Sequence, residues 1–477
     1  MFKNSIYKSV GLVLICAAYT ACKLPEVAQR NENKNVPASF SHSQDSLNSA
    51  SIQWRKFFTD PHLIDLIDTA LKNNQELNIT LQDIEIAKSE IRAKKGELLP
   101  SVNYRVGAGI EKVGRYTSQG AGDASTDIEP GREVPDPLPD YAFGLQANWE
   151  ADIWHKLRNA KKAAVSHYLS TVEGKNFVVT NLVAEVANSY YELLALDNQL
   201  DIVKKNIALQ SNALELMKIQ KEATRVTELA VRKFQAEVLS SKSLEFDIEQ
   251  KITESENKIN FLLGRYPQAI VRDKGSFTDL VPPTIQEGIP SQLLANRPDI
   301  KQAEFELAAA KLDVKVAKAQ FYPSLGISAG IGYQAFNPSY LLRTPESLLY
   351  SLAGDLAGPL INKNAIKAEY ISANAKQLQA VYEYEKSILN GYIEVANQLS
   401  SIGNLQKSYD LKAKQVKALT ESIDISNDLF KSARADYFEV LMTQRDALQS
   451  KLELIETKKQ QLNAVVNIYH ALGGGWN

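Results

Sequence analysis

The sequence predicts an α+β fold made of two copies of one unit, each with a helix, two β-strands and a long helical hairpin. Three observations indicate it. Segments of the first half recur in the second half at a constant spacing. Several short stretches alternate apolar with polar residues, which is the pattern of half-buried strands. Apolar residues also recur every seven positions over long stretches, as they do in coiled coils.

The composition limits the class of protein. The chain has 477 residues, 44% of them hydrophobic, and a formal net charge of −2. Because nucleic-acid binders usually carry a basic excess, the near-neutral charge predicts no nucleic-acid partner. The two cysteines are too few for a disulfide scaffold or a multi-cysteine metal site. No apolar run reaches the roughly 18 residues of a membrane helix.

We expect neither catalysis nor a cofactor. The sequence contains no nucleophile motif and no phosphate-binding loop, and none of its histidines pairs with another at metal-ligand spacing. An enzyme is therefore the least favoured class. The five histidines are His42, His62, His155, His167 and His470.

Residues 1–21 have the pattern of a secretory signal peptide, with two early lysines and a short apolar run. A buried N-terminal strand is the alternative. Cys22 follows Thr-Ala in a stretch that resembles a bacterial lipobox, which implies that the cysteine carries a lipid. Residues 22–60 then form a lipidated N-terminal arm, whose composition predicts little regular structure.

An internal repeat organises the rest of the chain. Residues 185–188 recur as residues 394–397, and the same offset of 209 places Leu263-Gly264 on Leu472-Gly473. A constant offset over about 80 residues is far less easily explained by chance than one short match. We therefore expect a first repeat over 61–264, an equatorial connector over 265–297, a second repeat over 298–473 and a C-terminal end over 474–477.

Each repeat begins with a helix, expected over about 61–98 and 298–321, which ends at the proline of a Pro-Ser pair. A β-hairpin follows, over about 101–153 and 324–359. Apolar residues at every second position mark its strands. They are Val102, Tyr104, Val106, Ala108 and Ile110; Phe143, Leu145, Ala147 and Trp149; Leu325, Ile327, Ala329, Ile331 and Tyr333; and Tyr350, Leu352 and Leu356.

A coiled-coil hairpin completes each repeat, over about 157–263 and 365–472. Its apolar residues recur in sevens, a period that imposes coiled-coil packing. For any one stripe the alternative is an ordinary amphipathic helix, but four long stripes in two matched pairs favour an antiparallel bundle. Examples are Leu193, Leu200, Ile207 and Leu214, and Ile388, Val395, Ile402 and Tyr409.

The long helices and the strands belong to different surroundings. A helix of some 65 residues is about 100 Å long, and its polar side requires water. The strands match outer-membrane strands, which need about 9–11 alternating residues. The alternative is that the aromatic residues in them form the core of a soluble sheet.

Four strands cannot close a barrel, and an open sheet edge cannot face lipid. Two copies would give eight strands with a filled interior, whereas three would give twelve strands and an aqueous pore. The economical solution is a trimeric membrane channel-tunnel, with a 12-stranded β-barrel above a periplasmic coiled-coil α-barrel.

Three motifs, in this order, resemble the TolC-type outer-membrane efflux factors, most closely the lipoprotein branch related to OprM and NodT. The resemblance covers nearly the whole chain after the signal peptide. The motifs are Trp54-x-x-Phe57-x-x-Asp60-Pro61-x-Leu63 followed by Ala70-Leu71-x-Asn73-Asn74; Arg297-Pro298-Asp299-Ile300 with Phe321-Tyr322-Pro323-Ser324; and Ala471-Leu472-Gly473-Gly474-Gly475-Trp476.

The resemblance implies the outer-membrane channel of a tripartite efflux or secretion system, a passive exit duct without catalytic activity. The chain would be a homotrimer, anchored by lipid in the outer membrane and extending into the periplasm. Its partners would be a periplasmic adaptor (membrane fusion) protein and an inner-membrane pump, expected to be of the RND type. The alternative is a lipid-anchored periplasmic coiled-coil scaffold that transports nothing.

The resemblance also places functional residues. The hairpin tips that face the adaptor would be Thr224-Arg225 and Ala433-Arg434, where the family often has glycine. At the passages from strand to helix, His155 stands where the family often has glycine, and Asn362-Lys363-Asn364 stands where it often has a glycine-containing turn.

Asp436 and Glu439, three apart and expected on one helical face, would form the periplasmic gate. Threefold symmetry would turn each of them into a ring of carboxylates. The alternative is a solvated face or a pair with Arg434.

Overall fold

The computed structural model describes residues 25–40, 47–275 and 277–476. The predicted signal peptide and the predicted lipidation residue Cys22 lie outside the described residues. The chain divides into two compact units. The first contains residues 25–31, Glu85–Tyr168 and Phe305–Val381, and the second contains the described residues of Glu32–Ile84, Leu169–Glu304 and Tyr382–Asn477.

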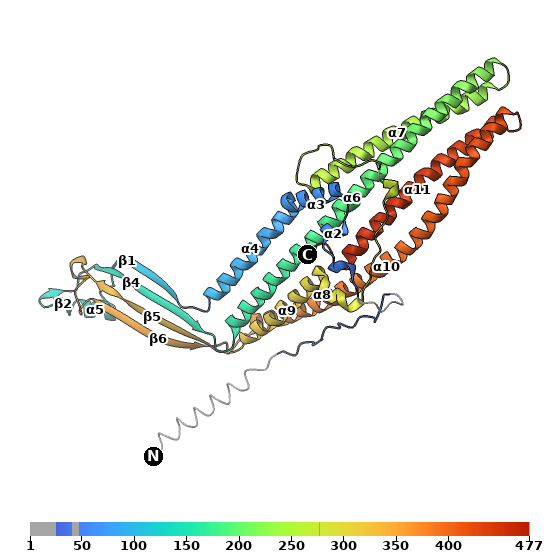
Figure 1. The fold of residues 1–477 in the computed structure, drawn as a ribbon. Coiled ribbons are helices and arrows are strands. Elements are labelled where there is room, and N and C mark those ends of the chain that lie inside the picture. Colours follow the sequence, from blue (N-terminus) through green and yellow to red (C-terminus); the bar gives the residue numbers. More distant parts are fainter. Residues whose placement is uncertain (1–24, 41–46, 276, 477) are drawn as a thin grey trace. The chain divides into compact units, whose positions relative to one another are not determined.

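The first unit is built on one antiparallel four-stranded sheet in the order β1-β4-β5-β6 (Figure 1). The central pair β4 and β5 comes from different repeats, which leaves β1 and β6 as the two free edges. The strands are β1 (Ser101–Glu111), β4 (Leu138–Ala151), β5 (Ser324–Ala335) and β6 (Leu348–Ala357).

The strand register gathers the apolar side chains on one face of the sheet. Tyr104 lies opposite Leu145, Leu145 opposite Ile331, and Ile331 opposite Tyr350. Because successive side chains point to opposite faces, the neighbouring row belongs to the other face. That row is polar or small: Asn103, Gln146, Gly330 and Ser351. The predicted period-two strands are thereby confirmed, and the apolar face is bare in the single chain, with Tyr104 83% exposed.

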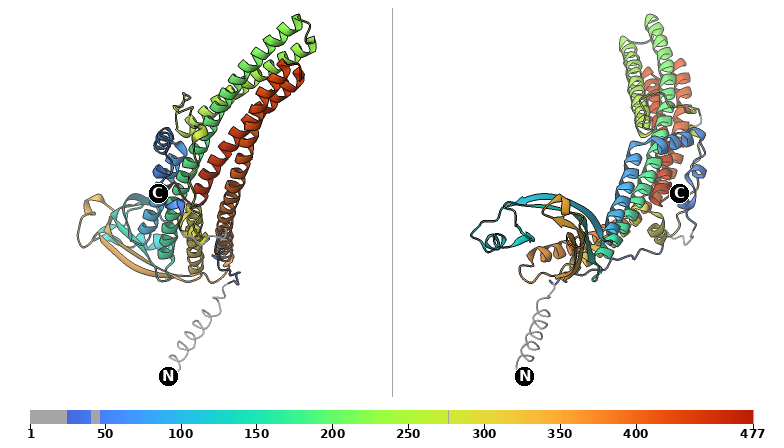
Figure 2. Two further views of the ribbon diagram at one scale, coloured as in Figure 1. Left: turned by 45° about the vertical axis from the view of Figure 1, so that its right-hand side comes forward. Right: turned by 90° about the vertical axis from the view of Figure 1, so that its left-hand side faces the viewer.

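Two helical hairpins follow the strands. The first consists of α6 (Lys156–Glu222, 67 residues) and α7 (Glu228–Leu262). The second consists of α10 (Asn364–Lys431, 68 residues) and α11 (Tyr437–Ala471). Within the second unit the two hairpins lie side by side (Figure 2). Buried Leu441 of α11 packs against Phe234 and Val238 of α7, so apolar contacts join the hairpins near their turns.

The helix expected over 61–98 is two helices, α3 (Pro61–Asn73) and α4 (Gln75–Gly96), separated by Asn74. The Asn74 side chain explains the break. Its Oδ1 accepts the backbone N–H of Leu77 at 3.0 Å and its Nδ2 donates to the Leu262 carbonyl at 2.9 Å. One side chain thus caps α4 and ties the break to the end of α7. In the second repeat, α8 (Leu293–Asn296) and α9 (Pro298–Ala319) are likewise separated by one residue, Arg297.

The main core of the second unit lies where the short helix α2 (Trp54–Phe57) and α3 pack on α6, α7 and α11. Phe57 stacks on Tyr469 with ring centroids 4.0 Å apart. Asp60 caps α3 by accepting the His62 N–H at 2.8 Å, and its second oxygen accepts the Tyr190 hydroxyl at 2.7 Å. The sequence motif that contains Trp54, Phe57 and Asp60 is therefore a packing motif.

Two connections join the strands at the sheet end away from the long helices. The first contains α5 (Ser118–Asp123) and a small hairpin of β2 (Asp127–Glu129) and β3 (Arg132–Glu133), and the second contains η4 (Pro338–Tyr340). They contact each other through the Tyr340 hydroxyl, which donates to Glu129 Oε2 at 3.0 Å.

No helix within the described ranges 25–40, 47–275 and 277–476 has the length and hydropathy required to cross a membrane.

The described part of the N-terminal arm, residues 25–40, has no helix or strand, but specific contacts hold it. In the first unit Val27 packs against Phe321 and Tyr370, near the strands. In the second unit Lys34 pairs with Glu304 at 2.6 Å. Phe40 stacks on Tyr392 at 5.5 Å between centroids.

Candidate functional site at the hairpin turns and the equatorial belt

The two hairpin turns share one backbone design. At the end of α6 the Thr224 N–H donates to Lys221 at 2.9 Å and the Arg225 N–H donates to Gln220 at 2.8 Å. At the end of α10 the corresponding bonds run from Ala433 to Phe430 and from Arg434 to Leu429, at 3.0 and 2.9 Å. This pair of bonds is a Schellman cap, which requires a left-handed residue.

Thr224 and Ala433 supply that left-handed residue, with φ of 56° and 55°. His155 (58°) and Asn362 (53°) have the same conformation where strands pass into α6 and α10. Among the described residues these four are the non-glycine residues with positive φ. Glycine adopts this conformation most easily, so each of these four residues holds it while carrying a side chain.

The opposite ends of the hairpins use the same cap with glycine. Gly264 follows α7 with φ of 65°, and Gly473 follows α11 with φ of 92°. A Cβ on Gly473 would lie 2.6 Å from the Asn296 carbonyl oxygen, and a Cβ on Gly264 would collide with the Asn73 carbonyl. Glycine is therefore required here by close backbone packing, whereas the exposed turns at Thr224 and Ala433 accept a side chain.

Of the two predicted gate residues, only Glu439 lies within the helix. Asp436 precedes α11 as its N-cap, and its carboxylate accepts the Phe438 N–H. Glu439 lies in the first turn of α11 and is exposed. Thr227 plays the same capping role at the start of α7, 209 positions earlier. A helix begins after a residue of extended backbone, and Asp436 is that residue, so Asp436 is the N-cap and Glu439 is the third residue of α11.

At the first hairpin turn, Glu228 forms two ion pairs. Its carboxylate pairs with Lys221 across the turn and with Arg232 at 2.7 Å. The hydrogen bond from Lys221 lowers the pKa of Glu228 below its ordinary value. Arg225 and Arg434 are exposed at the two turns.

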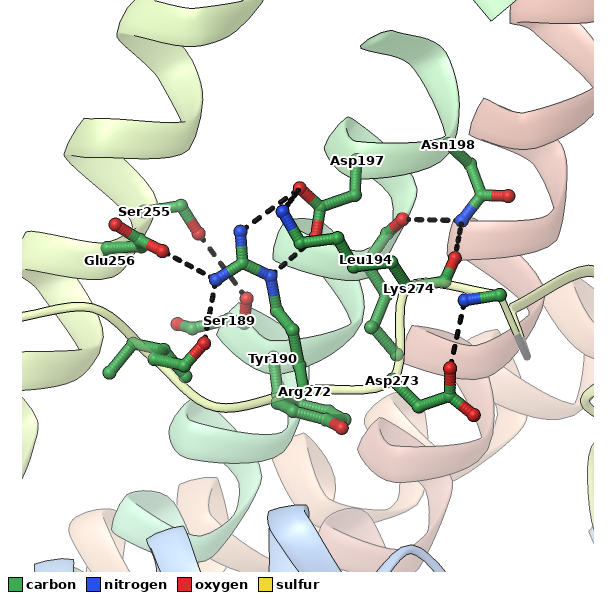
Figure 3. Close-up of polar contacts among 12 residues, drawn as sticks. Ser189, Tyr190, Leu194, Asp197, Asn198, Ser255, Glu256, Arg272, Asp273 and Lys274 are labelled. Atoms are coloured by element: carbon green, nitrogen blue, oxygen red, sulfur yellow. Dashed lines mark hydrogen bonds and ion pairs between the residues drawn. The ribbon is translucent and has the colours of Figure 1, made fainter. Parts of the chain in front are cut away.

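The equatorial belt is the region where the connector and the short helices meet the hairpins. At its centre the buried guanidinium of Arg272, 4% exposed, pairs with Asp197 of α6 and Glu256 of α7 (Figure 3). It also donates to the Ile270 carbonyl at 2.8 Å. Asn198 donates to the Lys274 carbonyl at 3.2 Å, so the connector is bound to α6 at Arg272 and again two residues later.

A second buried arginine, Arg297, joins the second repeat in the same belt. It donates to Asp299 Oδ2 and Glu394 Oε2 at 2.7 Å, and to the Ala471 carbonyl at 2.8 Å. Ala471 is the last residue of α11, as Leu262 is of α7. Arg297 thus ties the break between α8 and α9 to the end of α11, as Asn74 ties the break between α3 and α4 to the end of α7.

Sequence reasoning missed these belt roles. Arg272 stands in a connector without periodicity, and its partners are 75 and 16 positions away. The available signal was weak: one of three arginines in a connector that is rich in proline. Among the described residues, no three His, Cys, Asp or Glu side chains come together so as to hold a metal ion.

Comparisons with known proteins agree with one another. The sequence profile of the family described as outer membrane efflux protein matches residues 66–265 and 289–474. The pyoverdine export outer membrane protein OpmQ of Pseudomonas aeruginosa is 28% identical over 471 residues, covering 98% of this chain and 97% of that protein. The cation efflux system protein CusC of Escherichia coli is 27% identical over 470 residues, covering 97% of each.

A third relative is the probable outer membrane lipoprotein SilC of Salmonella typhimurium, 27% identical over 448 residues, covering 92% of this chain and 93% of that protein. A crystal structure of CusC superimposes with a TM-score of 0.80 at 24% identity, covering 94% of this chain and 99% of that one. The fold is therefore that of the channel-tunnels.

Proposed function

Because the chain belongs to the outer membrane efflux protein family, which consists of channel proteins of the outer membrane, we propose that three copies form one exit duct. Members of the family work as trimeric channels in tripartite efflux systems, and this chain is such an outer-membrane channel component. A role as a non-transporting scaffold is not favoured. The proposal assigns the chain no catalysis.

One observation carries the proposal. The four-stranded sheet has a continuous apolar face, a polar face and two free edges, β1 and β6. A free edge in lipid leaves backbone groups without partners, at a cost of several kcal/mol for each group. Pairing β6 of one copy with β1 of the next removes both edges. Three copies then close a twelve-stranded wall with its apolar face outward and its polar face toward the pore.

The turns at Thr224-Arg225 and Ala433-Arg434 are the proposed docking surface for a periplasmic adaptor protein. Their support is exposure, a fixed backbone and a shared positive charge on Arg225 and Arg434. The pump behind the adaptor is proposed to be of the RND type. OpmQ is named for pyoverdine export and CusC for cation efflux, so we assign the choice of cargo to the pump and none to this chain.

Asp436 and Glu439 both belong to the proposed gate, with separate roles. Glu439 offers an exposed carboxylate in the first turn of α11, which threefold symmetry would repeat as a ring that favours cations. Asp436 contributes charge and also holds the start of α11 in place as its N-cap.

Lipidation of Cys22 is proposed as the anchor of the chain. The arm that follows it begins, in its described part, beside the strand-proximal residues Phe321 and Tyr370. A lipid carried there would enter the same membrane as the sheet.

The test is to purify the full-length chain in detergent, determine its mass, and record single-channel currents in planar bilayers. A duct predicts a trimer with discrete, long-lived conductance steps. The same measurement on chain lacking the acyl group separates the two functions. A scaffold would become soluble without detergent and would give no steps, which would overturn the proposal.

A further inference from the structure

The helix ends next to the sheet carry an excess of positive charge. All four strands connect to their helices at the same end of the sheet, since Ser101, Asn148, Ser328 and Ala353 lie in one cross-strand row toward that end. Four segments meet there, within the first unit: 85–97, 150–162, 311–318 and 363–369. They contain thirteen Lys or Arg and seven Asp or Glu, an excess of six positive charges in a chain of net charge −2.

Three of these basic residues, Arg158, Lys161 and Lys162, line a surface groove of about 640 Å³, the basic groove. The rest of its lining is Leu98, Val165, Ser166 and Leu312. Arg158 Nε lies 3.7 Å from Asp152, so its charge is partly balanced. In the described part of the chain Lys161 and Lys162 take part in no ion pair. The groove therefore combines two unbalanced ammonium groups with three apolar side chains.

The groove continues directly from the apolar face of the sheet. Trp149 belongs to that face, because it shares its side of β4 with Leu145. Its indole N–H donates to the carbonyl of Leu98 at 3.1 Å, and Leu98 lines the groove. A molecule lying along the apolar face would meet Lys161 and Lys162 where the membrane ends. Trp154, which stacks on Tyr322 at 4.8 Å, stands at the same passage and fits the headgroup level.

We propose that the basic groove binds the phosphate of an anionic phospholipid in the periplasmic leaflet of the outer membrane. Lys161 and Lys162 would contact the headgroup, while Leu98, Val165 and Leu312 receive the start of an acyl chain that continues past Trp149. Charge complementarity selects the headgroup, because basic residues at a membrane surface attract anionic lipids. The inference rests on the sheet lying in the outer membrane, as proposed above.

The test measures the thermal midpoint of the full-length trimer in detergent with added phosphatidylglycerol, phosphatidylcholine or inorganic phosphate. We expect phosphatidylglycerol alone to raise the midpoint, by about 4 °C. The K161Q/K162Q variant should lose at least half of that rise, and K161R/K162R should keep it. K414Q/K417Q, which removes two exposed lysines of α10 outside the groove, is the matched control and should also keep it.

An equal rise in the wild type and K161Q/K162Q would overturn the proposal, as would an equal rise with phosphatidylcholine. A rise with inorganic phosphate alone would mean a free-anion site and would overturn the lipid assignment. Native mass spectrometry of retained phosphatidylglycerol gives a second reading if K161Q/K162Q has a lowered midpoint of its own. None of these measurements uses transport, so failure of the groove and failure of the duct are separate results.

Discussion

Thr224 and Ala433 hold the same left-handed backbone conformation, with φ of 56° and 55°, in turns that lie 209 positions apart. Each is the residue after which its hairpin reverses, and each donates its N–H into a Schellman cap. A β-carbon in this conformation costs roughly 1–2 kcal/mol, so both turns carry strain that a glycine would relieve. The duplicated unit has kept the backbone of its turns while the side chains diverged.

Replacing Thr224 and Ala433 with glycine should therefore stabilise the protein. Relief of left-handed strain exceeds the added entropy of the unfolded chain, for a net gain of about 0.5–1 kcal/mol per site. The thermal midpoint of the detergent-solubilised trimer measures it. Ala223→Gly, one position earlier and outside the left-handed region, should lower the midpoint instead. A fall for Thr224→Gly would mean that the strain argument fails.

Gly264→Ala and Gly473→Ala should have the opposite effect. Both positions have positive φ, and an added Cβ meets the backbone of Asn73 or Asn296, which cannot move without unfolding the belt. We expect a loss of more than about 3 kcal/mol, measured as reduced trimer yield and thermal midpoint. Gly403→Ala, within α10 and with no atom within 4 Å of its new Cβ, should be stabilising by about 1 kcal/mol. Equal behaviour of the three variants would contradict the packing argument.

Neutralising the gate should change conduction more than stability. Asp436→Asn keeps a good N-cap, and Glu439→Gln keeps the length of the side chain, so the double variant removes charge alone. We expect it to raise single-channel conductance and weaken cation preference in bilayers. Asp436→Ala should add a loss of about 1 kcal/mol in stability through the missing cap. Glu222→Gln, at the other turn, is the control, and unchanged currents in the double variant would remove Asp436 and Glu439 from the gate.

Arg272→Met should destabilise the belt strongly. It leaves Glu256 without its cation and leaves buried Asp197 with the exposed Lys274 alone, and breaking a buried pair in this way costs about 3–5 kcal/mol. Adding Asp197→Asn and Glu256→Gln should recover much of the loss, because the unbalanced charges are then gone. Lys274→Met, whose side chain is 67% exposed, should have an effect below about 1 kcal/mol. Denaturant titration of the trimer distinguishes these results, and a mild Arg272→Met would contradict the assigned role.

His470 should make stability depend on pH. Burial, and then the charge of Arg297, lower the pKa of its imidazole from the ordinary 6.5, and Nε2 lies 2.6 Å from Asn181 Oδ1. The unfolded state therefore binds the proton more readily than the folded state. The contribution of neutral His470 to the free energy of unfolding is full above pH 6.5, and it is lost as the pH falls toward the lower pKa of the folded state. The thermal midpoint of the wild type should decrease as the pH is lowered from 7.5 to 5, and that of His470→Gln should decrease less. His62→Gln serves as the control; if it flattens the profile equally, His470 is not the cause.

Sequence alone determined the parts of this molecule that depend on local pattern. The alternation of apolar residues within each strand predicted the strands, because a period of two puts the apolar side chains of one strand on one face. The register then decided that the four strands share that face, with Tyr104, Leu145, Ile331 and Tyr350 in one row. The heptads predicted the long helices, and the repeat placed both turns. The resemblance pointed to the turns at Thr224 and Ala433, whose left-handed backbone the structure shows.

Tertiary structure decided what depends on residues distant in sequence. Asn74 breaks a helix because the end of α7 lies beside it, and Asp436 is a cap because α11 begins there. Gly264 is required because Asn73 packs against it, and Arg272 finds Asp197 and Glu256 only once the hairpin is closed. Periodicity indicates whether a segment faces apolar or polar surroundings. A hydrogen bond or a steric clash depends on which atoms lie next to the segment, and only the folded chain brings those atoms together.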